Sequence, residues 1–223
     1  MKARSFAPIL ETARTRLGAS GLEARLAQPR SAAELKAMPD DRYLSQMELR
    51  IFRAGLKHSL VDAKWPAFEE VFHGFDPRRV RAISDEALER RLADRRLIRH
   101  WGKLKSVRDN AAAMVRVAEE KGSMGRYLGD WPDEEIAALW SDIAKRFTQM
   151  GGNSAAYFLR MAGKDTFILT PFVVRALNRW SAFKGEPKSK AERAKVAAAI
   201  FAWAKQAGRP LCQVSMILAR SVD

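Results

Sequence analysis

The segment 149–154, with the sequence QMGGNS, contains residue types that can hold an anion through the backbone. The adjacent glycines Gly151 and Gly152 permit backbone angles closed to other residues and let another group approach closely. Asn153 and Ser154 can cap a following helix, whose free N–H groups point outward. The pattern predicts a phosphate-binding helical hairpin, and a capped helix–helix turn is the alternative interpretation. The residues expected to contact phosphates here are Met150, Gly151, Gly152, Asn153, Ser154, Lys145 and Arg146.

The chain is strongly basic, with 40 Lys and Arg against 26 Asp and Glu, a net charge of +14 and a pI near 10.3. This excess predicts a polyanionic partner such as nucleic acid, although an Arg-rich surface that serves solubility is an alternative explanation. Charge alone does not separate DNA from RNA or from an acidic protein. Arg99 and Lys103 lie in a basic run at an expected helix junction, so we expect both to contact phosphates.

The elements that must position these residues are helices. Apolar residues recur at spacings of three and four almost everywhere, and no convincing alternating strand is present, so the sequence predicts an all-α, compact multi-helix globule. Capping residues, prolines and glycines set the expected ends. The expected helices span residues 5–17, 22–27, 32–38, 42–63, 66–73, 77–83, 85–93, 102–121, 133–147, 154–162, 171–180, 190–206 and 210–220.

Several classes of protein are excluded by composition. No run approaches the ~18–20 uninterrupted apolar residues of a membrane span. The N-terminal residues lack the apolar region of roughly 7–15 residues that a secretory signal needs. Cys212 is the single cysteine, which excludes an internal disulfide, and with three histidines a closed Cys/His zinc site is not expected. We therefore expect a cytoplasmic bacterial protein without a metal, cofactor or membrane partner.

Five short motifs between residues 54 and 111 occur in a recognisable order. They are Ala54-Gly55-Leu56, Phe72-His73-Gly74-Phe75-Asp76-Pro77, Ile98-Arg99-His100, Lys103-Leu104 and Asn110-Ala111. In type and order they resemble the DNA-3-methyladenine glycosylase I family of the helix-hairpin-helix DNA glycosylase superfamily. The hairpin glycine of that superfamily corresponds to Gly152, and Met150 stands where many members have another glycine. The resemblance covers roughly residues 42–180.

The resemblance implies a helix-hairpin-helix glycosylase fold and the excision of a damaged base from double-stranded DNA. Such an enzyme extrudes a nucleotide, holds its base against aromatic surfaces, and removes an alkylated purine of the 3-methyladenine kind by hydrolysis. Phe52 and Gly55 are then expected at the base pocket. We expect a monomer associated with the nucleoid, with an N-terminal helical extension (1–41), a glycosylase-like core (42–182), and a linker with C-terminal helices (183–223).

The chain departs from the family at the residues that matter most for catalysis. The family's pocket carboxylate falls on Arg50, and its pocket tryptophan falls on His58. On the expected helix 42–63 these two residues lie about 80° apart, so we expect them to share one wall of the pocket as the candidate catalytic pair. Glu48 lies about 200° from Arg50 on that helix and does not simply substitute for the carboxylate.

Two further features of the family are missing. The superfamily's usual Asp after the second hairpin helix has no counterpart in 168–173, and Asp165 is a weak stand-in. The family's Cys/His zinc clasp is absent too. These departures leave two functions open: a DNA glycosylase that acts on alkylated purines, or a glycosylase-fold protein that binds DNA or modified bases without efficient cleavage. A helical protein-interaction module is a third possibility, but it does not explain the basic excess.

Overall fold

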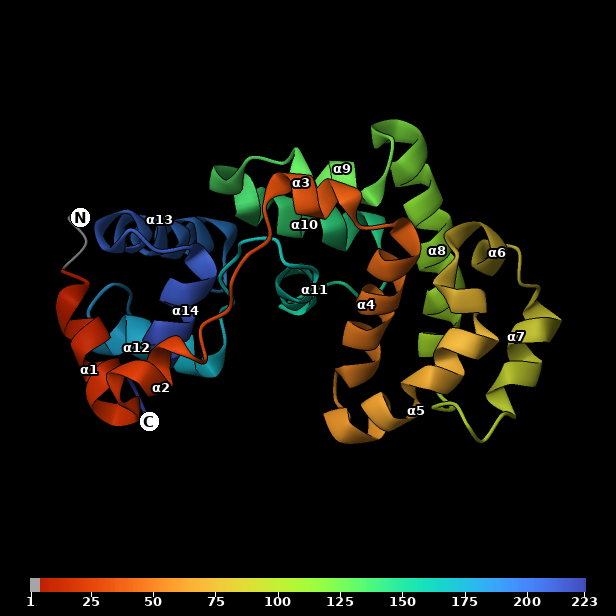
Figure 1. Cartoon of the computed structure of the whole chain (residues 1–223), viewed down its shortest axis with the longest axis horizontal. Coiled ribbons are helices and arrows are strands. Elements are labelled where there is room, and N and C mark those ends of the chain that lie inside the picture. Colours follow the sequence, from red (N-terminus) through yellow and green to blue (C-terminus); the bar gives the residue numbers. More distant parts are fainter. Residues whose placement is uncertain (1–4) are drawn as a thin grey trace. The chain divides into compact units, whose positions relative to one another are not determined.

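The computed structural model describes residues 5–223, and within that range the chain forms helices and no strand (Figure 1). The predicted all-α fold is therefore confirmed. Residues 1–4, the start of the segment tested for a secretory signal, lie outside the described part. None of the described helices is long and apolar enough to cross a membrane. The helices are α1 (Ala7–Leu17), α2 (Ala19–Glu23), α3 (Ala32–Ala37), α4 (Asp40–Arg53), α5 (His58–Val71), α6 (Pro77–Arg81), α7 (Asp85–Leu92), α8 (Trp101–Lys121), α9 (Met124–Gly129), α10 (Ile136–Arg146), α11 (Ser154–Ala162), α12 (Pro171–Arg179), α13 (Lys190–Ala207) and α14 (Leu211–Arg220), with 3-10 turns η1 (His73–Phe75) and η2 (Asp133–Glu135).

The chain divides into two compact units. The first comprises the residues through Arg30 together with Pro132–Ala138 and Asp165–Asp223. The second comprises Ser31–Trp131 and Leu139–Lys164. Every residue that the sequence places at the hairpin or the base pocket belongs to the second unit, so the site is built within one unit.

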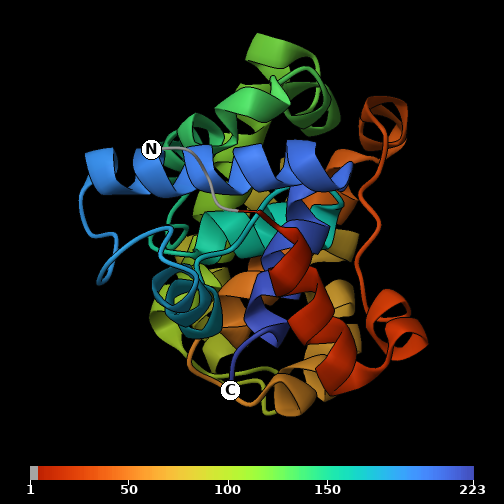
Figure 2. The same cartoon turned by 90° about the vertical axis from the view of Figure 1, so that its left-hand side faces the viewer.

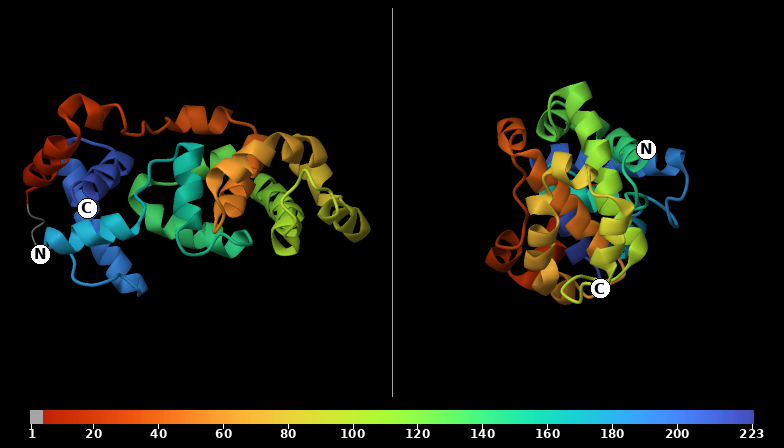
Figure 3. Two further views of the ribbon diagram at one scale, coloured as in Figure 1. Left: turned by 90° about the horizontal axis from the view of Figure 1, so that it is seen from below. Right: turned by 90° about the vertical axis from the view of Figure 1, so that its right-hand side faces the viewer.

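Helix α4 is central to the second unit, where it packs against α5, α8, α9 and α11. Figure 3 shows α4 beside α5 and α8. Its apolar stripe explains this position, because Leu44, Met47 and Ile51 recur on one face and are almost fully buried. Asp40 and Asp41 lie in its first turn, where negative charge is favourable.

The expected single helix 42–63 is wrong. Helix α4 ends at Arg53, and α5 begins at His58. The reason is Gly55, whose φ of 76° lies in the left-handed region that stops a helix and that glycine adopts without strain. Pro66, expected to begin a helix, lies inside α5 instead.

A cluster of aromatic rings explains why α5 continues through its proline. An interior proline costs a helix about 3 kcal/mol. Against this, Phe52 of α4 lies 4.6 Å from Phe68, and the rings of Trp65 and Phe75 stack at 5.3 Å. Phe72 extends the stack at 6.0 Å from Phe68. Such ring pairs add stabilisation beyond their buried area, so tertiary packing outweighs the local preference.

The first unit contains both ends of the described chain. Helix α14 packs against α1, α12 and α13, as Figure 2 shows for α1 and α13. Phe6 and Trp203 meet in its core with ring centroids 6.1 Å apart. Asp165 accepts the backbone N–H groups of Leu211 and Cys212, each at 2.8 Å. Asp165 therefore satisfies two free N–H groups in the first turn of α14, whose own N-cap residue is Pro210, and this accounts for a carboxylate at position 165.

Candidate nucleic-acid interface and base site

The turn between α10 and α11 presents an open backbone. Gly151, Gly152 and Asn153 are exposed, and a Cβ atom added to either glycine would meet nothing within 4 Å. Gly152 has a φ of 60°, and Gln149 before it has a φ of 58°. A ligand can therefore come into van der Waals contact with this backbone.

The turn is tied to α8 by side chains on both elements. Asn110 of α8 accepts the N–H of Thr148 at 2.7 Å, and its amide donates to the Thr148 carbonyl at 3.3 Å. Gln149 donates to the carbonyl of Gly102 at 2.7 Å. The side chain of Met150, which the sequence placed among the phosphate contacts, is fully buried and anchors the turn from below. Only the backbone groups of Met150 are therefore available to contact a ligand.

Asn110 also joins the turn to Glu48, a fully buried carboxyl on α4. Its amide donates to Glu48 Oε1 at 2.7 Å, and Ser106 Oγ lies 3.1 Å from Glu48 Oε2. Burial raises the pKa of Glu48 to about 8, with a smaller contribution from Asp109, while the hydrogen bonds from Asn110 and Ser106 oppose that rise. The carboxyl is therefore mostly neutral near pH 7.

The count of protons in this network supports the neutral form. Ser106 Oγ lies within hydrogen-bond distance of two acceptors, Glu48 Oε2 and the Lys103 carbonyl at 2.7 Å. A hydroxyl has one proton to donate. If Ser106 donates to the carbonyl, a protonated Glu48 completes the network by donating its own proton to Ser106.

Arg50 projects from α4 toward α11, where its guanidinium lies 4.4 Å from the centre of the Tyr157 ring. Its Nε is shielded from solvent and has no hydrogen-bond partner. Among residues 5–223 it forms no ion pair. Burial lowers the pKa of Arg50 and the nearby Arg53 adds to this effect, while Tyr157 opposes it. A guanidinium in this setting stays charged, and it lacks a counterion.

The other expected pocket residues are spread over different environments. His58 is exposed at the start of α5, so the shared helical wall expected for Arg50 and His58 does not exist. Gly55 is exposed in the turn between the two helices. Phe52 is fully buried in the aromatic cluster, and its ring is covered on several sides by neighbouring rings.

Lys103 points inward. Its Nζ donates to the carbonyls of Ala54 at 2.7 Å and Phe52 at 3.3 Å, and only 7% of the residue is exposed. Burial lowers the pKa of Lys103, and the charge of Arg50 adds to this effect. Lys103 thus satisfies the last carbonyls of α4, an arrangement favourable at the end of a helix. An ammonium bonded in this way is not directed at phosphates.

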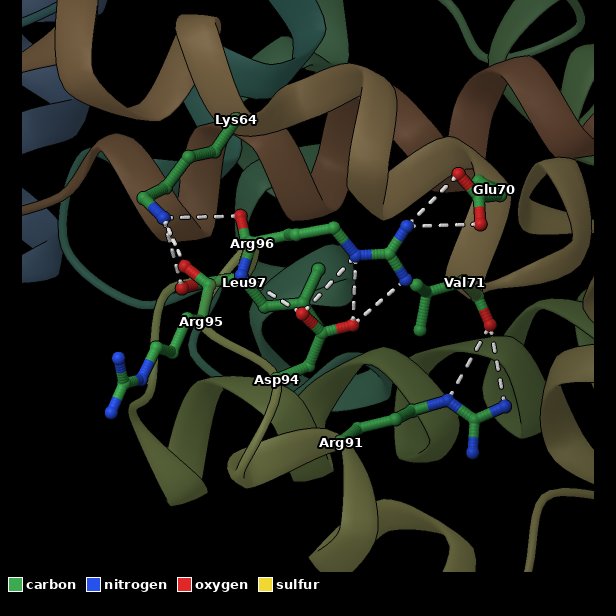
Figure 4. Close-up of polar contacts among 8 residues, drawn as sticks. All are labelled: Lys64, Glu70, Val71, Arg91, Asp94, Arg95, Arg96 and Leu97. Atoms are coloured by element: carbon green, nitrogen blue, oxygen red, sulfur yellow. Dashed lines mark hydrogen bonds and ion pairs between the residues drawn. The ribbon is translucent and has the colours of Figure 1, made fainter.

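The segment before α8 exposes the basic side chains of Arg99 and His100, and Trp101, the first residue of α8, is exposed beside them in sequence. Lys64 of α5 fixes the preceding loop, because its Nζ donates to the carbonyls of Arg95 at 2.7 Å and Arg96 at 3.1 Å (Figure 4). Two further contacts in Figure 4, from Arg96 to Glu70 and from Arg91 to the Val71 carbonyl, also join the region to α5. The loop is therefore attached to α5 by several hydrogen bonds.

The basic pair expected on α10 divides into one exposed and one paired side chain. Lys145 is exposed. Arg146 is engaged by Asp142 at 2.7 Å and by Glu120 at 2.8 Å. Lys145 and Arg99 are therefore the basic side chains of the expected phosphate-contacting set that are both exposed and outside the ion pairs of the described chain.

The described residues do not fit the zinc clasp of the resembled family. Residues 5–223 contain no group of three His, Cys, Asp or Glu side chains placed to hold a metal ion. Cys212 is buried in α14, with its Sγ 3.5 Å from the Ala27 carbonyl.

Solved structures of 3-methyladenine DNA glycosylase I share this architecture. One has a TM-score of 0.50 at 22% identity and covers 63% of this chain and 84% of its own. Another, from Staphylococcus aureus, has a TM-score of 0.51 at 19% identity and covers 62% of this chain and 80% of its own. The chain therefore shares the all-α fold of these structures.

The family is shown by sequence. The family model for methyladenine glycosylases matches residues 35–159, more than half of the chain, and the chain belongs to this family. DNA-3-methyladenine glycosylase 1 of Escherichia coli K12 is 36% identical over 67 residues. That match covers 30% of this chain and 36% of the relative, so it spans little more than a third of the relative's length.

Sequence reasoning missed the connections that organise the site. Glu48 follows Leu44 by four residues and Met47 by one, on the stripe that faces the core, and a carboxylate at such a position is a signal of a buried acid. Tyr157 and Gln149 carried no comparable signal, because their roles depend on contacts between distant segments.

Proposed function

We propose that the protein is a base-excision DNA glycosylase, which extrudes an altered purine from double-stranded DNA and hydrolyses its N-glycosidic bond. The observation that carries this proposal is the open turn at Gly151 and Gly152, held rigidly by Asn110 in a member of the methyladenine glycosylase family. Backbone N–H groups at such a turn suit a phosphate. The protein acts as a monomer on the nucleoid in the bacterial cytoplasm.

Binding begins at the phosphates. The turn at 151–154 holds one part of the backbone, and the exposed side chains of Arg99 and Lys145 contact flanking phosphates. The target nucleotide then leaves the stack, at a cost of a few kcal/mol that is lowest for a damaged or mispaired base. Arg50 and Tyr157 receive the extruded base. As the glycosidic bond breaks, the sugar passes through an oxocarbenium-like state before water adds.

A second candidate function is favoured by one observation. Glu48 is fully buried and mostly neutral near pH 7, and Arg50 occupies the position of the family's pocket carboxylate. Neither side chain supplies a negative charge to an oxocarbenium ion. The alternative is therefore a protein that binds lesions through the same surfaces and cleaves slowly or not at all.

The direct experiment is to incubate the protein with methylated duplex DNA and to identify released bases chromatographically. Release of free base supports the glycosylase, and tight lesion binding without release supports the alternative. Salt-dependent duplex binding is expected in both cases. Neutralising Arg99 or Lys145 should reduce the salt slope by about one each, equally for damaged and undamaged DNA.

Glycine substitutions test the hairpin itself. Gly151→Ala adds a side chain to the exposed turn where the backbone φ is not positive, and Gly152→Val adds a branched one, so both should weaken duplex binding severalfold. Gly185→Val is the matched control for Gly152→Val, because Gly185 also has a positive φ and open space around it but lies in the first unit. Unchanged DNA binding by both folded hairpin variants would remove the turn from the interface.

A further inference from the structure

Arg50 has an arrangement that a protein seldom keeps without a ligand. Its Nε is shielded from solvent with no acceptor, and no carboxylate of residues 5–223 pairs with it. Arg53, one turn further along α4, is paired with Asp62 at 2.7 Å. Of these two arginines on one helix, only Arg50 lacks a partner. An unsatisfied buried donor of this kind calls for an explanation. Because Nε itself is shielded while Arg50 as a whole is only partly buried, a ligand would bind to the two terminal nitrogens of the guanidinium.

The geometry points to Arg50 as the reader of the extruded base, with a preference for an uncharged purine that carries two adjacent acceptors on one edge. This inference rests on the proposed function. The central carbon of the guanidinium lies over the Tyr157 ring, 4.4 Å from the ring centre, so the ring covers one side of the group and its N–H edge remains as the binding surface. That edge contains only donors.

The donor edge selects the chemistry of the base. Arginine matches the O6 and N7 acceptors of a guanine-type edge through two parallel hydrogen bonds. Hypoxanthine, the deamination product of adenine, presents the same two acceptors and is uncharged. The amino group of an adenine edge is a donor and does not match, and a cationic 3-methyladenine is repelled by Arg50 as well.

The charge of Arg50 also suits the departure of an uncharged base. The bond between C1′ and N9 breaks with its electron pair going to N9, so the base leaves as an anion and the sugar becomes an oxocarbenium ion. Donors on O6 and N7 stabilise the negative charge that spreads over the base. Water then forms the new bond to C1′, and its proton ends on the base, which gives an abasic sugar and neutral free hypoxanthine.

Normal guanine carries the same edge, so discrimination must come from extrusion. A base in a weak or mismatched pair leaves the stack at lower cost than one in a Watson–Crick pair. Hypoxanthine opposite thymine is such a base, whereas guanine opposite cytosine is not. The substrate is thus selected in two ways: its base presents the acceptors that Arg50 binds, and its base pair opens at low cost.

The test compares single-turnover base release from two duplex substrates, one with hypoxanthine opposite thymine and one with 3-methyladenine. The wild type should release hypoxanthine faster than 3-methyladenine. Arg50→Gln and Arg50→Lys should each slow hypoxanthine release by about 10- to 100-fold, because both lose the paired donors while Lys keeps the charge. Arg50→Glu should lose hypoxanthine release and gain release of 3-methyladenine.

Arg53→Gln is the matched control, since it removes the same charge one turn away, and it should leave both rates unchanged within about twofold. Release of 3-methyladenine by the wild type, with hypoxanthine untouched and all Arg50 variants unaffected, overturns the inference while the proposed function stands. Absence of salt-dependent duplex binding together with absence of any base release overturns both. Full hypoxanthine release by Arg50→Lys overturns the paired-donor recognition.

Discussion

Glu48 and Arg50 are separated by one residue on α4, and their surroundings are opposite. Glu48 is fully buried, and each of its oxygens has a partner, Asn110 at 2.7 Å and Ser106 at 3.1 Å. Arg50 is only partly buried, but its Nε is shielded and has no partner. A carboxyl escapes the cost of buried charge by keeping a proton, whereas a guanidinium stays charged at any pH that a folded protein tolerates.

The difference separates structure from recognition on one helix. The network around Glu48 closes within the protein: it connects α4 through Ser106 and Asn110 of α8 to Thr148 at the hairpin. Nothing within residues 5–223 closes the network around Arg50. Polar groups without hydrogen-bond partners are typically found at functional sites. We therefore expect a ligand at Arg50, whereas the hydrogen bonds of Glu48 stabilise the fold.

At a fixed pH of about 7, removal of the buried carboxyl of Glu48 should have the largest effect on stability. Glu48→Leu fills much of the same space but leaves the amide of Asn110 without its partner at Glu48. Unsatisfied buried groups cost about 1–3 kcal/mol each, so we expect a loss of about 3 kcal/mol in the free energy of unfolding, measured by denaturant titration at pH 7.

Glu48→Gln is the matched control for that measurement. A glutamine can accept from Asn110 through its carbonyl and donate to Ser106 through its amide, as the neutral acid does. We expect a loss of less than about 1 kcal/mol, since both hydrogen bonds are retained. If the two variants were equally destabilised, Glu48 would have to act as a carboxylate.

The same carboxyl should also make stability depend on pH. The pKa of Glu48 is about 8 in the folded protein against an ordinary value of 4.5. Between these values the folded state keeps a proton that the unfolded state releases, so the stability contributed by Glu48 is complete below pH 4.5 and declines as pH rises toward 8. The decline amounts to at most about 1.4 kcal/mol per pH unit.

The measurement compares the free energy of unfolding of wild type and Glu48→Gln from pH 5 to pH 9. The difference between them should shift against the wild type as pH rises, and it should level off above the pKa of about 8. A difference that is constant across the range would contradict a neutral Glu48. The same titration should loosen the hairpin, because Asn110 contacts both Glu48 and Thr148.

The sequence predicted the helices better than the contacts between them. The expected range 154–162 coincides with α11, and Gly151 and Gly152 were expected and found at the turn before it. Helical periodicity and capping are local, so they can be read along the chain. The boundary near Gly55 was missed because apolar spacing continues on both sides of it.

The candidate site was harder to predict, because the direction in which a charged side chain points depends on residues that are distant in the sequence. The sequence predicts an exposed basic side chain at Lys103. In the structure this side chain points inward, because its Nζ donates to the carbonyls of Phe52 and Ala54. Arg50 was singled out by its place in a family motif. Its contact with the Tyr157 ring follows from the packing of α4 against α11, which no local sequence pattern predicts.

The smallest predicted effect has the opposite sign. Arg50→Met removes a half-buried charge that has no counterion and replaces it with a flexible apolar chain that can cover Tyr157. We expect the free energy of unfolding to rise by about 1 kcal/mol while release of an acceptor-bearing base falls. Arg53→Met is the control, and loss of its exposed pair with Asp62 should change stability by less than about 1 kcal/mol. A variant that is more stable and less active than the wild type would show that Arg50 serves ligand binding and not the stability of the fold. Destabilisation by Arg50→Met would instead make the stacked guanidinium part of the fold and would remove the contrast with Glu48.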